Sequence, residues 1–222
     1  QGGCMAQIFG PRANPLSRLS VYGAFGAMAL FVVGLAIYSR SPYPAFIHNS
    51  PDQPVPYSHQ LHVGGLKIDC RYCHSGVEVS AVAGVPPTQT CMTCHSQIKT
   101  DSPALAPVRD SFASGVPVAW NRVNDLADFA YFNHSIHIAK GVGCSTCHGN
   151  ISEMAKVEQV QPLTMGWCLQ CHRNPEQYLR PPEAIYDTTW QPPANQAEQG
   201  AALVQQYNIQ VSKLTNCSIC HR

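Results

Sequence analysis

The hydrophobic pattern divides the chain into one long apolar stretch and a longer part without sustained periodicity. From Leu19 to Tyr38 the sequence contains no charged residue and no proline. As an α-helix this stretch is about 30 Å long, enough to cross the hydrocarbon layer of a membrane. The pattern therefore predicts a cytoplasmic N-terminal segment over residues 1–18 and a single transmembrane helix over residues 19–38.

The charges beside this stretch favour a cytoplasmic N-terminus. Arg12 and Arg18 precede it, Arg40 follows it, and the first acidic residue of the chain is Asp52. A secretory signal peptide is the alternative. The apolar run is longer than the core of a signal peptide, and no clear small-residue cleavage site follows it.

The remainder predicts short helices joined by loops, because it is rich in helix-breaking residues: the chain has 18 prolines and 16 glycines. Residues 39–56 contain five prolines and predict an extended tether. Residues 96–131 form a second connection with little periodicity. The strongest helix signal outside the membrane stretch runs from Asn195 to about Gln206, where Asn195 and Glu198 resemble a capping box.

Composition adds a cofactor to this picture. The 222 residues include 11 cysteines and 10 histidines, while charged residues make up only 12%. The net charge of +1 gives no electrostatic case for binding nucleic acid, which requires clustered Lys and Arg. Such cysteine density is typical of disulfides, zinc sites, iron–sulfur clusters or haem attachment, and spacing decides between them.

Ten of the eleven cysteines form Cys-x-x-Cys pairs that are followed at once by histidine. These are Cys70, Cys73 and His74; Cys91, Cys94 and His95; Cys144, Cys147 and His148; Cys168, Cys171 and His172; and Cys217, Cys220 and His221. This is the signature of c-type haem, whose two vinyl groups form thioethers with the thiols while the histidine ligates iron. Zinc ribbons and disulfides make no demand on the residue after the pair, so the sequence predicts five haem c groups.

The other histidines include two matched pairs within an internal repeat. The pattern aromatic-x-His-x-x-His, followed by two haem motifs, occurs at residues 57–95 and again at 132–172. It contains His59 and His62 in the first copy and His134 and His137 in the second. Three-residue spacing places both imidazoles of a pair on one side of a helical turn, so each can ligate a different iron. We therefore expect these four histidines to be distal ligands.

One haem is then left without an assigned distal ligand, and the sequence leaves three candidates open. His48 completes the set by number but lies outside the repeat. Met154 and Met165 are thioether alternatives, and a thioether ligand raises the reduction potential. Cys4 has no partner in the chain and could be a lipid site or a bystander.

Together these features predict the fold class: one N-terminal transmembrane helix and a loop-rich, mainly short-helix multihaem cytochrome domain with two related dihaem repeats. The domain would span residues 57–222, with the repeats at 57–95 and 132–172 and the last haem at 217–221. Haem is attached to thiols on the outer side of the cytoplasmic membrane, so this domain is expected there. With five haems in so short a chain, the porphyrins would form much of the core, and the haem-free domain is expected not to fold.

Several segments resemble the pentahaem subunit of alternative complex III, and the haem core is similar to class III multihaem cytochromes. The resemblance rests on Tyr57-Ser58-His59, Ile68-Asp69-Cys70-Arg71-Tyr72-Cys73-His74, Tyr131-Phe132-Asn133-His134-Ser135, Cys147-His148-Gly149 and Leu163-Thr164-Met165-Gly166-Trp167-Cys168. It implies an electron-transfer subunit, not itself catalytic, in a quinol-oxidising complex of the inner membrane, with its haem domain on the periplasmic side. The implied partners are an iron–sulfur subunit related to molybdopterin enzymes, polytopic quinol-binding membrane subunits, a monohaem cytochrome and membrane lipid.

Two other functions compete with this one. A single-anchor multihaem quinol dehydrogenase that feeds a periplasmic reductase typically has methionine two residues after the first motif histidine, where this chain has Gly76. A multihaem reductase needs an iron with an open position, often marked by lysine in place of a motif histidine. All five motifs here end in histidine.

Overall fold

The computed structural model describes residues 10–41 and 43–221, so Cys4 and Pro42 lie outside the described residues. The chain divides into two compact units, Gln1–Ala45 and Phe46–Arg222, which are considered separately.

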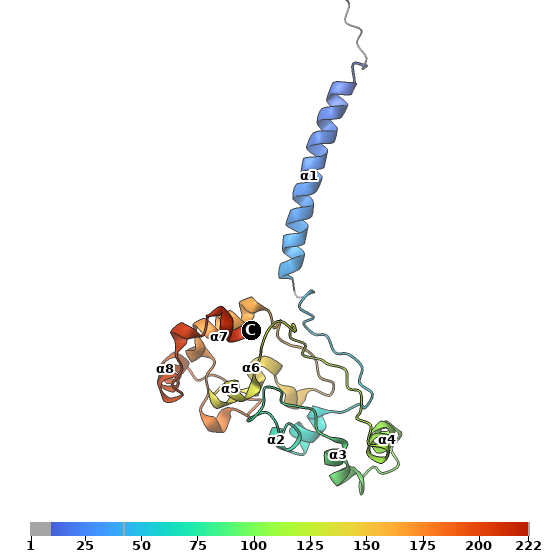
Figure 1. Cartoon of the computed structure of the whole chain (residues 1–222), viewed down its shortest axis with the longest axis vertical. Helices are drawn as coiled ribbons and strands as arrows, with labels where there is room; N and C mark the ends of the chain where they lie inside the picture. Colours follow the sequence, from blue (N-terminus) through green and yellow to red (C-terminus); the bar gives the residue numbers. More distant parts are fainter. Residues whose placement is uncertain (1–9, 42, 222) are drawn as a thin grey trace, which may run out of the picture. The chain divides into compact units, whose positions relative to one another are not determined.

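The first unit contains α1, a single helix over Ala13–Arg40 (Figure 1). It includes the whole predicted stretch 19–38 and continues beyond it at both ends. None of its residues is buried, and large apolar side chains such as Leu30 and Phe31 are exposed along its length. By length and composition it can cross a membrane. A signal sequence near the N-terminus meets the same two criteria.

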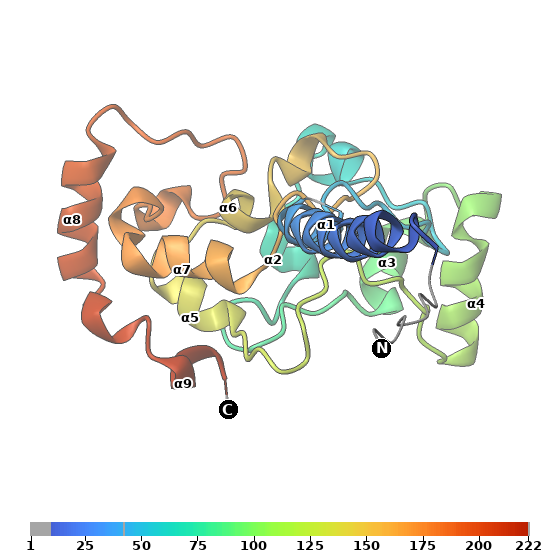
Figure 2. The same ribbon diagram turned by 90° about the horizontal axis from the view of Figure 1, so that it is seen from above.

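The second unit is built from short helices and loops, and no strand occurs among its described residues. Its α-helices are α2 (Cys70–Cys73), α3 (Thr88–His95), α4 (Ala106–Ser114), α5 (His134–Ala139), α6 (Cys144–His148), α7 (Met165–Arg173), α8 (Gln196–Gln206) and α9 (Cys217–Cys220). One π-helical turn, η1 (Gln60–Gly65), and five 3₁₀ turns complete it: η2 (Pro103–Leu105), η3 (Ile151–Glu153), η4 (Pro175–Gln177), η5 (Pro182–Ala184) and η6 (Val211–Lys213). Figure 2 shows α3, α2, α6 and α7 following one another across this unit.

The helix predicted from Asn195 to about Gln206 is confirmed as α8, but its capping box is not formed. The Asn195 side chain makes no bond to a backbone N–H of the first turn, and its Oδ1 instead accepts from Gln199 Nε2 at 3.1 Å. Gly200 lies on the face of α8 that packs against η4. A side chain at this position would collide with the backbone carbonyl of Glu176, so the close approach requires glycine.

The connection 96–131 contains a helix that the hydrophobic pattern does not predict. Pro107 lies in the first turn of α4, where its missing N–H costs no hydrogen bond, and Gly115 ends the helix in the left-handed conformation with φ 73°. Only Val108 and Ser111 of α4 are buried. So narrow a buried face produces no clear periodicity in the sequence.

Residues 46–56, the second part of the expected tether, belong to the second unit and bond to it. The His48 N–H donates to the Gln159 carbonyl at 2.7 Å, and the Gln159 N–H donates to the Asn49 carbonyl at 3.0 Å. The Ser50 hydroxyl donates to the Val157 carbonyl at 2.8 Å. This segment is therefore fixed along residues 157–159.

The protein core of the second unit is thin. Besides Pro175 and several glycines, seven apolar residues are buried in the described part of the chain: Val55, Val77, Val108, Leu179, Ala184, Ile185 and Leu203. Only Leu179 has a side chain that is almost completely enclosed, at 1% exposure. So small a core is far less apolar burial than a domain of this length usually has.

Candidate haem sites

Each of the five Cys-x-x-Cys-His motifs lies on a helical turn, in α2, α3, α6, α7 and α9. Three-residue spacing on such a turn places both thiols of a pair on one side of the helix. Local capping sets where two of the turns begin: the Asp69 carboxylate accepts from the Arg71 N–H at 2.8 Å, and the Thr164 hydroxyl accepts from the Trp167 N–H at 3.4 Å. Each motif thus presents two thiols and one imidazole to one space.

The four histidines of the repeat each face a different motif histidine. The distances between ring centres are 6.5 Å for His59 and His74, 6.3 Å for His62 and His95, 6.5 Å for His134 and His148, and 6.2 Å for His137 and His172. A metal bonded at about 2.0–2.1 Å to one nitrogen of each ring would separate the two ring centres by roughly 6 Å. The four spacings therefore fit one iron between each pair.

A backbone carbonyl oxygen lies within hydrogen-bonding distance of the Nδ1 atom of most of these rings. His74 Nδ1 lies 2.7 Å from the Gly84 carbonyl oxygen, His134 Nδ1 lies 2.9 Å from that of Ala81, and His172 Nδ1 lies 2.9 Å from that of Leu214. His62, His95, His137 and His221 make the same kind of contact, with carbonyls of residues 58, 98, 133 and 129. A Nδ1–H that donates to a carbonyl leaves the Nε2 lone pair for a metal, the usual arrangement of a ligating histidine.

Burial keeps the central imidazoles in the neutral form that a metal requires. Burial, followed by the neighbouring histidines, lowers the pKa of His59 and of His148 to about 4. Burial also lowers the pKa of His137. At neutral pH these rings are uncharged and can donate a lone pair.

The first residue of each copy of the repeat is aromatic, and it makes the same two ring contacts in both copies. Tyr57 stacks on His62, with ring centres 4.4 Å apart, and meets His59 edge-on at 4.9 Å. Phe132 stacks on His137 at 4.6 Å and meets His134 edge-on at 4.8 Å. In each copy one aromatic ring fixes the orientation of both imidazoles.

No imidazole faces His221 in the described part of the chain. The ring that lies beside it is that of Phe129, with centres 6.1 Å apart. His48 has a side chain that is 73% exposed and lies 3.5 Å from the Glu158 carboxylate. Two methionine candidates remain, and they differ in position: the end of the Met154 side chain approaches Gly149, next to His148, whereas Met165 is exposed on the first turn of α7.

Electrostatic interactions between thiols indicate which motifs are neighbours. Burial is the main cause that raises the pKa of four of these thiols. The second cause is the charge of a nearby thiol from another motif. Cys91 acts in this way on Cys73, Cys70 on Cys144, Cys171 on Cys147, and Cys220 on Cys168. The Tyr72 and Thr93 hydroxyl oxygens, 2.8 Å apart, also join the first two motifs. These interactions indicate that the second motif lies next to the first, the first next to the third, the third next to the fourth, and the fourth next to the fifth.

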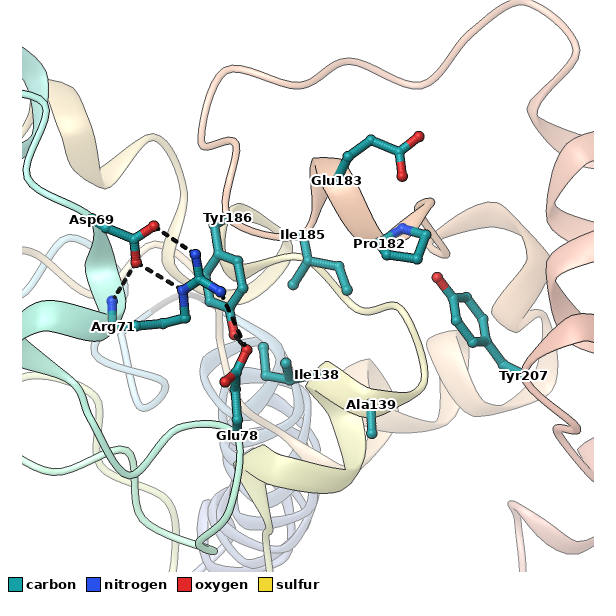
Figure 3. Close-up of a pocket in the computed structure, with 10 residues that line it drawn as sticks. All are labelled: Asp69, Arg71, Glu78, Ile138, Ala139, Pro182, Glu183, Ile185, Tyr186 and Tyr207. Atoms are coloured by element: carbon teal, nitrogen blue, oxygen red, sulfur yellow. Dashed lines mark hydrogen bonds and ion pairs between the residues drawn. The ribbon is translucent and has the colours of Figure 1, made fainter.

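Sequence reasoning missed a polar network beside the first motif. Arg71 forms a two-point ion pair with Asp69, lies 3.7 Å from Glu78 and stacks over the Tyr186 ring at 4.6 Å (Figure 3). The Tyr186 hydroxyl donates to Glu78 at 2.7 Å. These residues line one side of an open cavity of about 750 Å³. The Asp69-x-Arg71 spacing was the only signal for this network in the sequence.

The C-terminal part of the chain is similar to a known family of cytochromes. A model of the family "Cytochrome c7 and related cytochrome c" matches residues 130–222, which include α5, α6, α7 and α9. Residues 130–222 are therefore similar to cytochrome c7 and related multihaem cytochromes. Cytochromes of this kind hold haem c covalently, so the match supports haem attachment at the cysteine pairs of residues 130–222.

A relative extends the similarity beyond this cytochrome domain. The chain is 28% identical over 175 residues to the menaquinone reductase multihaem cytochrome c subunit of Nitratidesulfovibrio vulgaris, covering 68% of this chain and 83% of that protein. By its name, the relative is the multihaem cytochrome c subunit of a menaquinone reductase. The chain is thus related to a multihaem cytochrome that works within a larger assembly.

Proposed function

We propose that this cytochrome is an electron-transfer subunit that carries electrons through five covalently bound haem c groups. The observation that carries the proposal is the set of four facing imidazole pairs, each with ring centres 6.2–6.5 Å apart and each including the histidine of a different motif. When bound, each haem iron would supply one-electron redox chemistry. The chain itself would hold, orient and insulate the five groups and would contribute no catalytic residue.

The residues that would hold the haems divide by role. Thioether bonds would come from Cys70, Cys73, Cys91, Cys94, Cys144, Cys147, Cys168, Cys171, Cys217 and Cys220. Proximal ligands would be His74, His95, His148, His172 and His221, and distal ligands His59, His62, His134 and His137. Each histidine pair would join the two haems of its own repeat, since His59 and His62 face the first and second motifs. The matched contacts of Tyr57 and Phe132 support two related dihaem units.

Met165 is the distal ligand that we propose for the fifth haem. It precedes Cys168 by one turn of α7 and lies on the same side of that helix, and Cys168 is the thiol that neighbours Cys220 of the fifth motif. Its side chain is 64% exposed, so it does not fill the protein core. Met154 is close to the third motif, whose histidine already faces His134, and His48 pairs with Glu158.

The contacts between neighbouring motifs support a linear order of haems. The order would be second, first, third, fourth and fifth, with α3 at one end and α9 at the other. Electrons would therefore enter or leave at the haems of Cys91 and Cys217. Both end motifs contain an exposed thiol position, Cys94 and Cys217, as expected for haems that exchange electrons with other proteins.

For the assembly, we propose a membrane quinol:acceptor oxidoreductase of the alternative complex III type. The support is the resemblance of its motifs, the apolar helix α1 and the relationship to a subunit of a quinone-linked complex. The helix would be a single-pass anchor in the inner membrane with the haem domain on the periplasmic side. Partners would be an iron–sulfur subunit related to molybdopterin enzymes, polytopic quinol-binding subunits and a monohaem cytochrome.

A second direction of electron flow is favoured by the relative, which is named as part of a menaquinone reductase. In that case electrons would enter the haem chain from an outer donor and leave to a quinone in the membrane. The ligand set and the haem order would be the same. The two candidates differ only in the direction of electron flow: quinol gives electrons to the haems in the first, and the haems give electrons to a quinone in the second.

The test is purification of the full chain with its native partners, followed by two half-reactions. A menaquinol analogue added to the oxidised complex should reduce all five haems if quinol is the donor. A quinone added to the reduced complex should instead reoxidise them if the chain serves quinone reduction. Absence of both reactions in a complex that retains membrane subunits would contradict both candidates.

A further inference from the structure

Arg180 is a buried cation whose direct partners are all uncharged. Only 4% of it is exposed. Its guanidinium donates to the Asp187 carbonyl at 2.9 Å, to the Ala184 carbonyl at 3.4 Å, and to the Ser145 and Thr146 hydroxyls at 2.7 and 3.2 Å. The Trp190 ring covers one face of it, with the guanidinium carbon 4.4 Å from the ring centre.

No carboxylate of the described chain forms an ion pair with this guanidinium. Asp187 offers only its backbone, because its carboxylate accepts from the Thr189 N–H and hydroxyl at 2.9 and 2.7 Å. Burial accordingly lowers the pKa of Arg180, although the more distant Asp187 charge acts in the opposite sense. A guanidinium nonetheless remains protonated in proteins, so a positive charge stays in this site.

The guanidinium group lies beside the third haem motif. Ser145 and Thr146 are the two residues between Cys144 and Cys147, so the guanidinium lies directly against the turn that holds both thiols. Gly143 permits this approach, since a side chain there would collide with the guanidinium. Arg71, the arginine at the first motif, differs because Asp69 and Glu78 neutralise it.

We propose that Arg180 is a positioning residue that raises the reduction potential of the haem attached at Cys144 and Cys147. Reduction adds one electron to ferric iron and lowers the net charge of the haem by one. A fixed positive charge nearby therefore favours the ferrous form, and it does so strongly where burial limits solvent screening. The inference rests on the proposed function, because it requires haem at this motif.

Burying an arginine without an ion-pair partner costs stability, and a neutral side chain would fill the same space at lower cost. The packing nevertheless encloses the guanidinium on several sides with carbonyls, hydroxyls and an indole ring. An electrostatic role accounts for this arrangement, and a purely structural role does not require the charge.

The experiment is a spectroscopic redox titration of the full chain in its native complex, with the variants Arg180→Gln and Arg180→Lys. The Gln variant should make one of the five haems about tenfold harder to reduce, a downward shift of roughly 59 mV for one electron. The Lys variant keeps the charge and should recover most of the shift. The control Arg122→Gln removes an exposed arginine that is paired with Asp125, and it should leave all five potentials unchanged.

Two further variants identify the haem that shifts and protect the test against misfolding. His134→Met replaces the imidazole that faces His148 and should raise the potential of the third haem, which marks its component in the titration. Gly143→Ala should displace the guanidinium from the motif without removing it, and should lower the potential of the same component.

The proposal is overturned if the Gln and Lys variants shift the potentials equally, if no potential shifts while five haems remain bound, or if the component that shifts is not the one marked by His134→Met. Failure of the proposed function would look different. In that case the unmodified chain would itself contain fewer than five haems.

Discussion

At the scale of the residue, each facing imidazole pair joins one histidine of the His-x-x-His repeat to the histidine of one haem motif. The motifs and the His-x-x-His repeat predict which imidazoles face a metal, because both are local patterns. Which distal ring faces which motif depends on backbone turns distant in sequence, such as the one that brings the Ala81 carbonyl within 2.9 Å of His134 Nδ1. Arg180 was missed because a single arginine has no motif around it.

His62→Ala tests the pairing at this scale. Loss of this imidazole should leave the haem of the second motif attached but without its distal ligand, so one haem should become high-spin. Electron paramagnetic resonance of the oxidised protein measures this change. His48→Ala is the matched control, because His48 is exposed and faces no motif histidine, and its spectrum should match that of the unmodified protein. Equal spectra for both variants would contradict the pairing.

At the scale of the element, the sequence predicted the helices that have an uninterrupted local pattern of residues. The uncharged stretch predicted the centre of α1, and the uninterrupted run before Gln206 predicted α8. The helix α4 and the π-helical turn η1 were not predicted, because their regular structure depends on a few contacts with other elements. The predicted capping box at Asn195 was also wrong, because the Asn195 side chain bonds to Gln199 instead.

Met165→Ala tests the role of α7 beyond its own motif. If the Met165 thioether completes the fifth haem, its removal should give one high-spin haem and lower that haem's affinity for an electron. Met154→Ala should leave the spin state of all five haems unchanged, because Met154 lies beside a motif that already has two imidazoles. The assignment is contradicted if the Met154 variant alone becomes high-spin.

Gly200→Val tests the packing of α8 on η4. The added side chain would collide with the Glu176 backbone, and we expect a loss of about 1–3 kcal/mol of stability or more. Thermal unfolding of the holoprotein measures it. Ala201→Val places the same β-branched residue at an exposed position of the same helix and should change the melting temperature much less.

At the scale of the whole molecule, we propose that the fold depends on its cofactors. The few buried apolar residues of the second unit offer little to offset the conformational entropy of ordering it, so we expect haem faces to supply most of the apolar surface that folding removes from water. The ratio of motifs to chain length leads to the same expectation. The order that we propose for the motifs in space was not predictable from the sequence, because it depends on interactions between motifs that are distant in the chain.

Removal of haem attachment should therefore unfold the second unit. A chain in which all ten motif cysteines are changed to alanine should give circular dichroism with little helix beyond α1 and a poorly dispersed amide spectrum. A single-motif variant, Cys217→Ala with Cys220→Ala, is the milder comparison and should retain most of the helix signal. A well-dispersed spectrum from the haem-free chain would show that the protein core suffices.

The central claim is that iron porphyrin is bonded at all five thiol pairs of one chain. Intact mass of the chain purified from its native membrane, combined with a pyridine haemochrome assay, measures this directly. The account predicts a mass increase equal to five haems and five haems per polypeptide in the assay. A smaller number, or zinc at the thiol pairs, would contradict it.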